Sequence, residues 1–169
     1  MRKSPSRRAV EGVSLIEVMV AILVFSIGLL GIAMLQMRGA QFTKESGSRT
    51  SAIILARSLA DAMRANPGGA HPAGGVANSA YLYDGSTAYT AKDCASTTLG
   101  TPSDIAKRDI ACWRVALGNA LPAPADDKPL AAVTANKDLG TLIITVSWTG
   151  VADDKTSDPN QSYSFSYLQ

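Results

Sequence analysis

The chain has 169 residues, with 16 Lys and Arg against 14 Asp and Glu, and a formal net charge of +2. This length suits one domain with an additional element. The near-balance of charge argues against a dedicated nucleic-acid-binding protein, which carries a basic excess on one face. The positive charge is concentrated at the start, because residues 1–12 hold four basic side chains against Glu11 alone. We therefore expect no nucleic-acid partner.

The apolar residues are concentrated at positions 13–35, where 18 of 23 are apolar and Glu17 is the only charged one. As a helix this segment is about 34 Å long, enough to cross a hydrocarbon core of about 30 Å. A cleaved secretory signal has a shorter apolar region and a small-residue cleavage site, which residues 34–38 do not offer. A plain membrane anchor stays open but leaves Glu17 unexplained, because a carboxylate inside a membrane is costly and usually marks function.

A third interpretation accounts for both the length of the segment and its acidic residue. The basic leader, residues 1–12, ends in Gly12, and Val13-Ser14-Leu15-Ile16-Glu17 opens the apolar run. This order resembles the class III signal of type IV pilins and pseudopilins. The resemblance implies that a prepilin peptidase cuts between Gly12 and Val13 on the cytoplasmic side, that Val13 is then N-methylated, and that the apolar segment is retained. The family's usual first mature residue is Phe, whereas this chain has Val13.

Glu17 matches the glutamate that the pilin family carries at the fifth mature position, if Val13 is the first. In a low-dielectric setting its carboxylate can pair with the new amine of its own chain or of a neighbour. The resemblance implies that Glu17 is an assembly contact in the growing fibre. The alternative is an acidic residue that lies at the membrane edge by chance.

Residues 36–66 extend the helical pattern beyond the membrane-spanning segment. Leu55, Leu59 and Met63 recur with helical spacing, and Pro67 ends the pattern. We expect an amphipathic continuation of the helix that packs on a globular domain formed by residues 67–169. The leader has four Lys and Arg, and the first twelve residues after position 35 have two, which favours a cytoplasmic leader and a periplasmic domain.

Two segments near the C-terminus alternate apolar and polar residues. Residues 141–148 and 162–168 are predicted to pair as an antiparallel hairpin, covered on one face by the long helix. Between them lies a polar loop with Asp153, Asp154 and Asp158, which lack the spacing of an EF-hand and indicate a solvated turn. The predicted fold class is α+β.

Between the long helix and the hairpin the pattern is less regular. A helix is predicted to start at a cap formed by Ser103 or Asp104 and to run to about Leu121. Residues 67–80 are rich in Gly, Ala and Pro and indicate a loop. Three tyrosines are interpreted as belonging to one or two short strands: Tyr81, Tyr83 and Tyr89.

The chain has only two cysteines, Cys94 and Cys112. Two are too few for a zinc site, and the seventeen residues between them exclude a CxxC redox motif. An exported domain would place them in an oxidising compartment, which favours a structural disulfide. Two unrelated buried thiols are the alternative.

No residue set in the chain suggests catalysis or a cofactor. The single histidine, His71, lies in a predicted loop without ligand companions and is expected to be solvated. One loop histidine is poor material for a nucleophile–base–acid set. We therefore expect no enzymatic activity, no metal and no cofactor.

The resemblance continues beyond the signal. The phrase ARSLADAMRANP, the pattern Asp109-x-x-Cys112-Trp113-x-x-x-Leu117 and a late ITVSW strand are similar to PilV-type minor pilins, also called type IV pilus modification proteins. The resemblance implies a pilin-like fold, a long helix on a small antiparallel sheet, in a low-abundance subunit of a priming or tip complex. Its implied partners are the prepilin peptidase, other minor pilins, the major pilin and the inner membrane, before it enters the fibre on the cell surface.

Two alternatives to a minor pilin stay open. One is a minor pseudopilin of type II secretion, which shares the signal and the long helix. The other is a periplasmic enzyme or binding domain on a single-span anchor, which an uncut Gly12 would favour.

Overall fold

The computed structural model describes residues 12–150 and 158–168. The first eleven residues of the expected leader lie outside the described residues, and so do Asp153 and Asp154 of the expected solvated turn. Residues up to Phe42 form one structural unit and residues from Thr43 a second.

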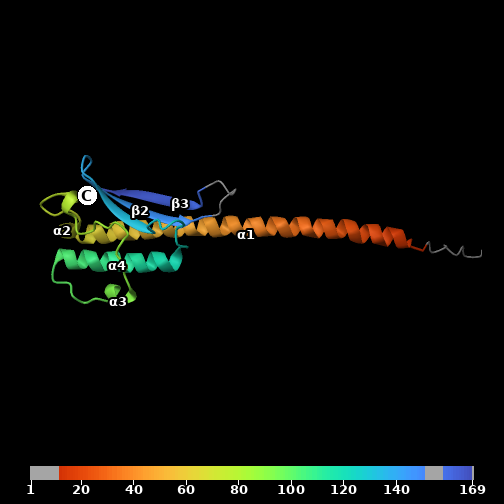
Figure 1. The fold of residues 1–169 in the computed structure, drawn as a ribbon, viewed down its shortest axis with the longest axis horizontal. Coiled ribbons are helices and arrows are strands. Elements are labelled where there is room, and N and C mark those ends of the chain that lie inside the picture. The colour runs from red at the N-terminus through yellow and green to blue at the C-terminus, as the bar shows by residue number, and fades with distance from the viewer. Residues whose placement is uncertain (1–11, 151–157, 169) are drawn as a thin grey trace, which may run out of the picture. The chain divides into compact units, whose positions relative to one another are not determined.

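Helix α1 runs from Leu15 to Ala65 and is the longest element of the chain (Figure 1). This confirms the expectation of a helix that continues beyond the apolar segment. Glu17 lies in its first turn and Arg64 in its last. Both positions favour the helix, because an acidic side chain interacts well with the N-terminal end of the helix dipole and a basic one with the C-terminal end.

The part of α1 in the first unit exposes its apolar side chains. Phe25 is 66% exposed and Leu30 is 71% exposed. By length and composition α1 is the one helix among the described residues that is apolar enough to cross a membrane, and no residue of its apolar window is buried. The spanning segment predicted at 13–35 falls on this exposed part of the helix.

The part of α1 in the second unit buries one face. Leu59 and Met63 are fully buried as expected, whereas Leu55 is half-buried at the margin of the core. Alanines complete the face and let the helix approach its neighbours closely: Ala52, Ala56 and Ala60. On the outer face Asp61 pairs with Arg64, one turn further along the helix.

The sheet has three antiparallel strands in the order β1-β2-β3. They are β1 (Ala131–Asn136), β2 (Thr141–Thr149) and β3 (Asn160–Tyr167). The β2–β3 hairpin confirms the prediction, and alternate side chains of β2 are buried in the core: Leu142, Ile144, Val146 and Trp148. Strand β1 was not predicted, because Val133 is the only large apolar residue in its sequence.

Helix α4 (Pro102–Ala120) buries Ile110, Trp113 and Leu117, as its spacing predicts. Its N-terminal cap is Thr101, so the prediction of Ser103 or Asp104 as the cap is wrong. Asp104 instead occupies the third helical position and completes a capping box, in which it accepts hydrogen bonds from the Thr101 backbone and hydroxyl.

The region between α1 and α4 differs most from the predictions. Residues 67–80, interpreted as a loop, contain α2 (Pro67–Ala70) and the short 3-10 helix η1 (Val76–Asn78). The tyrosines interpreted as strand residues form no strand, and only Tyr83 makes an isolated bridge, to Val133. A further short helix, α3 (Ala91–Cys94), precedes α4.

Candidate functional site

The predicted processing site lies in non-helical backbone just before α1. Gly12, Val13 and Ser14 precede the helix, and Val13 is 71% exposed. The Ser14 carbonyl accepts hydrogen bonds from the N–H groups of Glu17, at 3.0 Å, and Val18, at 3.3 Å. The expected scissile bond between Gly12 and Val13 is therefore free of helical hydrogen bonding and accessible to a peptidase.

Gly12 has no structural reason to be a glycine. A Cβ atom built at this position meets nothing within 4 Å. A larger side chain would therefore fit without disturbing the described residues. If a glycine is required here, the requirement comes from an enzyme that recognises this position and not from the packing of the described residues.

Glu17 is exposed on the first turn of α1 and makes no ion pair within residues 12–150 and 158–168. It lies among exposed apolar neighbours, of which Ile16 is 68% exposed and Val20 is 55% exposed. Once this surface is covered by lipid or protein, the carboxylate has to find a cationic partner or pay a desolvation cost.

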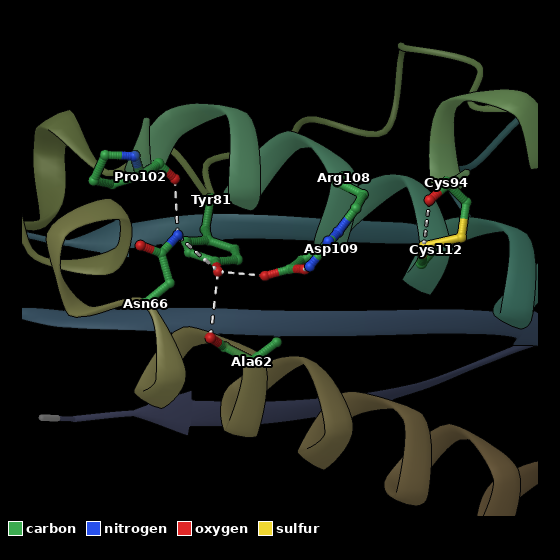
Figure 2. Close-up of polar contacts among 8 residues, drawn as sticks. All are labelled: Ala62, Asn66, Tyr81, Cys94, Pro102, Arg108, Asp109 and Cys112. Carbon is green, nitrogen blue, oxygen red and sulfur yellow. Dashed lines mark hydrogen bonds and ion pairs between the residues drawn. A yellow bond between two sulfur atoms is a disulfide. The ribbon is translucent and has the colours of Figure 1, made fainter. Parts of the chain in front are cut away.

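A buried polar cluster joins the end of α1 to α4 within the second unit (Figure 2). The Tyr81 side chain is completely buried, and its hydroxyl donates to Asp109 Oδ2 at 2.7 Å. The Ala62 carbonyl lies 3.3 Å from the same hydroxyl and shares its single proton. Asn66 Nδ2 donates to the Tyr81 oxygen at 3.2 Å and to the Pro102 carbonyl at 2.8 Å. The cluster therefore links the last turn of α1 to the first two turns of α4.

The electrostatics of this cluster follow from its burial. Burial raises the pKa of the Tyr81 hydroxyl well above its usual value, and the hydrogen bond to the Asp109 carboxylate raises it further. Arg108 Nη2 lies 3.3 Å from Asp109 Oδ1 and balances the charge of that carboxylate. The hydroxyl is thus held protonated as a donor, which suits a structural linkage.

Gly69 makes room for the Asn66 contact. A Cβ atom at Gly69 would lie 2.5 Å from Asn66 Nδ2 and 2.9 Å from the Pro102 carbonyl oxygen. Contacts that short do not occur, so the hydrogen bond from Asn66 to Pro102 requires a glycine at this position of α2.

Cys94 and Cys112 form a disulfide, with Cα atoms 4.5 Å apart (Figure 2). This confirms the expected pairing. Cys94 is the last residue of α3, and Cys112 lies in the middle of α4. The bond therefore fixes a four-residue helix, too short to be stable alone, to a long one.

His71 is not solvated, so that prediction is wrong. Its ring lies 5.6 Å from the Tyr167 ring, and both ring nitrogens are buried without a hydrogen-bond partner in the part of the chain that the structure describes. This contact places His71, the residue after α2, against the last residue of β3. No sequence pattern predicts this contact, because His71 and Tyr167 lie far apart in the chain.

Among the described residues, no three His, Cys, Asp or Glu side chains are placed to hold a metal ion. Two features of the described residues therefore stand out. One is the exposed apolar segment of α1 with its single carboxylate in the first unit, and the other is the Tyr81 cluster, which links the end of α1 to α4 within the second unit. Sequence reasoning missed Asn66, Gly69 and Tyr81 in this role. The run Asn66-Pro67-Gly68-Gly69 was available as a signal, but it indicated only a helix end.

A long N-terminal helix packed on a small three-stranded antiparallel sheet is a pilin-like α+β architecture. Two family models match the chain in adjoining segments. The model of the prokaryotic N-terminal methylation motif matches residues 7–33, and the model of the type IV pilin Tt1218 matches residues 34–111. The chain thus carries a segment that matches the prokaryotic N-terminal methylation motif, followed by a segment that is similar to the type IV pilin Tt1218. Comparisons with curated proteins and with solved structures give no match.

Proposed function

We propose that this chain is a minor pilin that takes part in type IV pilus assembly after a prepilin peptidase cuts between Gly12 and Val13. The observation that carries the proposal is the apolar, wholly exposed N-terminal part of α1, which follows the proposed cleavage position and overlaps the match to the methylation motif over residues 15–33. Such a helix needs a cover. The inner membrane supplies it before assembly, and the helices of neighbouring pilins supply it inside the fibre.

Glu17 favours the move of the helix from the membrane into the fibre, but only after cleavage. In the uncut chain, Val13 contributes a neutral amide, so the Glu17 carboxylate has no new cation to pair with. Cleavage creates an amine at Val13, and its charge attracts a carboxylate strongly where water is excluded. Pairing of Glu17 with the amine of a neighbouring subunit would offset the cost of burying both charges when the helix leaves the membrane.

From the resemblance to PilV-type minor pilins we further propose that the chain is a low-abundance subunit of a priming or tip complex. Its partners would be other minor pilins and the major pilin. The domain from residue 67 onward would lie in the periplasm and then on the fibre. The disulfide between Cys94 and Cys112 supports an oxidising location for it. In this role the chain is a substrate of the peptidase and has no enzymatic activity of its own.

The proposal is tested with Glu17→Ala in a strain that lacks the wild-type copy. We expect membrane insertion to be kept, because the change removes a charge from the apolar segment, and incorporation into sheared filaments to fall at least tenfold. Glu45→Ala is the matched control, since Glu45 is the next acidic residue of the same helix and lies outside the span. Normal filament assembly by Glu17→Ala would show that Glu17 is not an assembly contact.

The alternative assignments are separated by the phenotype of a deletion strain. Loss of pili with normal protein secretion supports the minor pilin. Loss of type II secretion with normal pili supports a pseudopilin. A chain that stays in the membrane with Gly12 uncut and enters neither filament supports an anchored periplasmic domain.

A further inference from the structure

Strand β3 forms one outer edge of the sheet (Figure 1). The hydrogen bonds of the sheet define which residues of β3 direct their backbone N–H and C=O groups toward this open edge. Val133 of β1 exchanges backbone bonds with Tyr83, at 3.0 and 2.7 Å, on the side away from β2. Val133 and Ile144, which lie opposite each other, are therefore a non-hydrogen-bonded pair. Ile144 must direct its N–H and C=O to the other side, toward Phe165 of β3.

The same alternation holds along the whole hairpin. The odd-numbered residues of β3 direct their backbone N–H and C=O groups toward β2. The even-numbered residues direct theirs toward the open edge of the sheet. The hydrogen bond from the Gly150 N–H to the Pro159 carbonyl, at 2.7 Å, follows the same pattern, because it also joins an even-numbered residue on the β2 side to an odd-numbered residue on the β3 side. Ser162, Ser164 and Ser166 therefore direct their backbone N–H and C=O groups away from the sheet. Within residues 12–150 and 158–168 these backbone groups have no partner.

The chemical character of this edge invites pairing. The three serine side chains are exposed on the outer face, whereas Tyr163 and Phe165 are half-buried against the core on the opposite face. Residues 160–168 contain no charged residue and no proline. Natural edge strands are usually protected by such residues, because an open edge is a template for another strand.

We propose that β3 pairs in antiparallel fashion with β3 of a second copy of this chain, about a two-fold axis at Ser164. In this register Ser164 lies opposite its own copy, Ser162 lies opposite Ser166, and Tyr163 lies opposite Phe165. The sequence Ser-Tyr-Ser-Phe-Ser reads nearly the same in both directions, so all three serines exchange backbone bonds with the partner. Both aromatic pairs then fall at non-hydrogen-bonded positions, where facing side chains approach most closely.

A second copy fits this edge for two further reasons. The strand is uncharged, so that like charges do not meet across the axis. The contact is also isologous and closes on itself, since the opposite edge of the sheet is partly occupied by the Tyr83 bridge at Val133. The result is a dimer with one continuous six-stranded sheet. This inference stands apart from the proposed pilus function, and its test needs only the purified full-length chain in detergent.

Cysteine cross-linking tests the register. Ser164→Cys is expected to give a disulfide-linked dimer under mild oxidation, because the Cα atoms of a hydrogen-bonded pair are about 5.5 Å apart, within disulfide range. Ser162→Cys alone is the matched control and should stay monomeric, since its own copy lies about 14 Å away along the strand. A mixture of Ser162→Cys with Ser166→Cys should form the mixed dimer.

A second pair of variants tests the pairing without cysteine. Ser164→Lys places two ammonium groups opposite each other and should weaken dimerisation by about tenfold or more in light scattering. Ser164→Thr keeps the hydroxyl that contacts Thr145 at 3.1 Å and should dimerise like the wild type. The proposal is overturned if Ser164→Cys remains monomeric, if Ser162→Cys cross-links as readily, or if Ser164→Lys dimerises as well as Ser164→Thr.

Discussion

The Tyr81 hydroxyl and Asp109 Oδ2 lie 2.7 Å apart although 28 positions separate the two residues in the chain. Tyr81 follows the turns after α1, and Asp109 lies in the second turn of α4. Their hydrogen bond, together with the bonds of Asn66, holds α4 to the end of α1. The α4 helix in turn carries Cys112 and therefore the disulfide to α3. The Tyr81 cluster as a whole thus connects the end of the long helix to α4 and, through the disulfide, to α3.

We expect Tyr81→Phe to lower the free energy of unfolding of the second unit by about 1–3 kcal/mol, because Asp109 and the Ala62 carbonyl lose their shared donor. Unfolding can be followed in the detergent-solubilised chain through Trp113 and Trp148, which are both buried in this unit. Tyr83→Phe is the control, since its hydroxyl donates to the Thr87 carbonyl, which lies nearby in the chain. Equal losses for the two variants would contradict a special role for Tyr81.

The raised pKa of Tyr81 predicts a loss of stability in alkali. The folded state holds the hydroxyl protonated, whereas in the unfolded chain it titrates near pH 10. The stabilisation is therefore fully present below about pH 10 and is lost as pH rises above it. Burial also raises the pKa of Tyr167 and Tyr89, so that the effect is shared. Denaturant titrations between pH 8 and about 11 should show a shallower decline for Tyr81→Phe than for the wild type, and parallel declines would refute the assignment.

Gly69→Ala should be strongly destabilising, by about 2 kcal/mol or more. The new Cβ atom would displace Asn66 from the Pro102 carbonyl, leaving buried polar groups without partners. Gly118→Ala in α4 is the matched control, because its nearest neighbour, a side-chain atom of Arg114, lies 3.6 Å away. It should be neutral or stabilising by about 0.5–1 kcal/mol. Thermal unfolding of both variants decides the point.

The disulfide predicts that denatured, unreduced protein binds no thiol reagent, whereas reduced protein binds two equivalents. The double variant Cys94→Ser, Cys112→Ser should lose about 3 kcal/mol, the chain-entropy value for a loop of this size. Two free thiols in protein extracted from the membrane under thiol-blocking conditions would contradict both the bond and the oxidising location that it supports.

The elements with strong hydrophobic periodicity were predictable from the sequence. Apolar spacing predicts the continuous helix, the β2–β3 hairpin and the buried face of α4. In each of them the local conformation that the spacing favours is also the one that buries the apolar side chains. Strand β1 escaped prediction because it consists mainly of alanines and polar residues, and it is held in place by its pairing with β2. Its strand conformation is a tertiary effect.

The internal contacts of the site were not predictable in the same way. The sequence interpretation places Tyr81 on a short strand, whereas its burial and its hydrogen bond to Asp109 determine its role in the structure. The prediction of a solvated His71 rests on its place in a predicted loop without ligand companions, yet the Tyr167 ring contacts it. The cap of α4 was missed by two or three positions, although the spacing of Thr101 and Asp104 is the signature of a capping box.

The central claim, that this chain is a processed pilin, is tested most directly by the N-terminus of the protein extracted from the membrane. Intact mass and N-terminal analysis should show a chain that begins at Val13 with a methylated amine. Gly12→Leu should abolish the cut without affecting the domain, because the position has open space around it. A chain that retains residues 1–12, or one cut after Leu35, would contradict the claim.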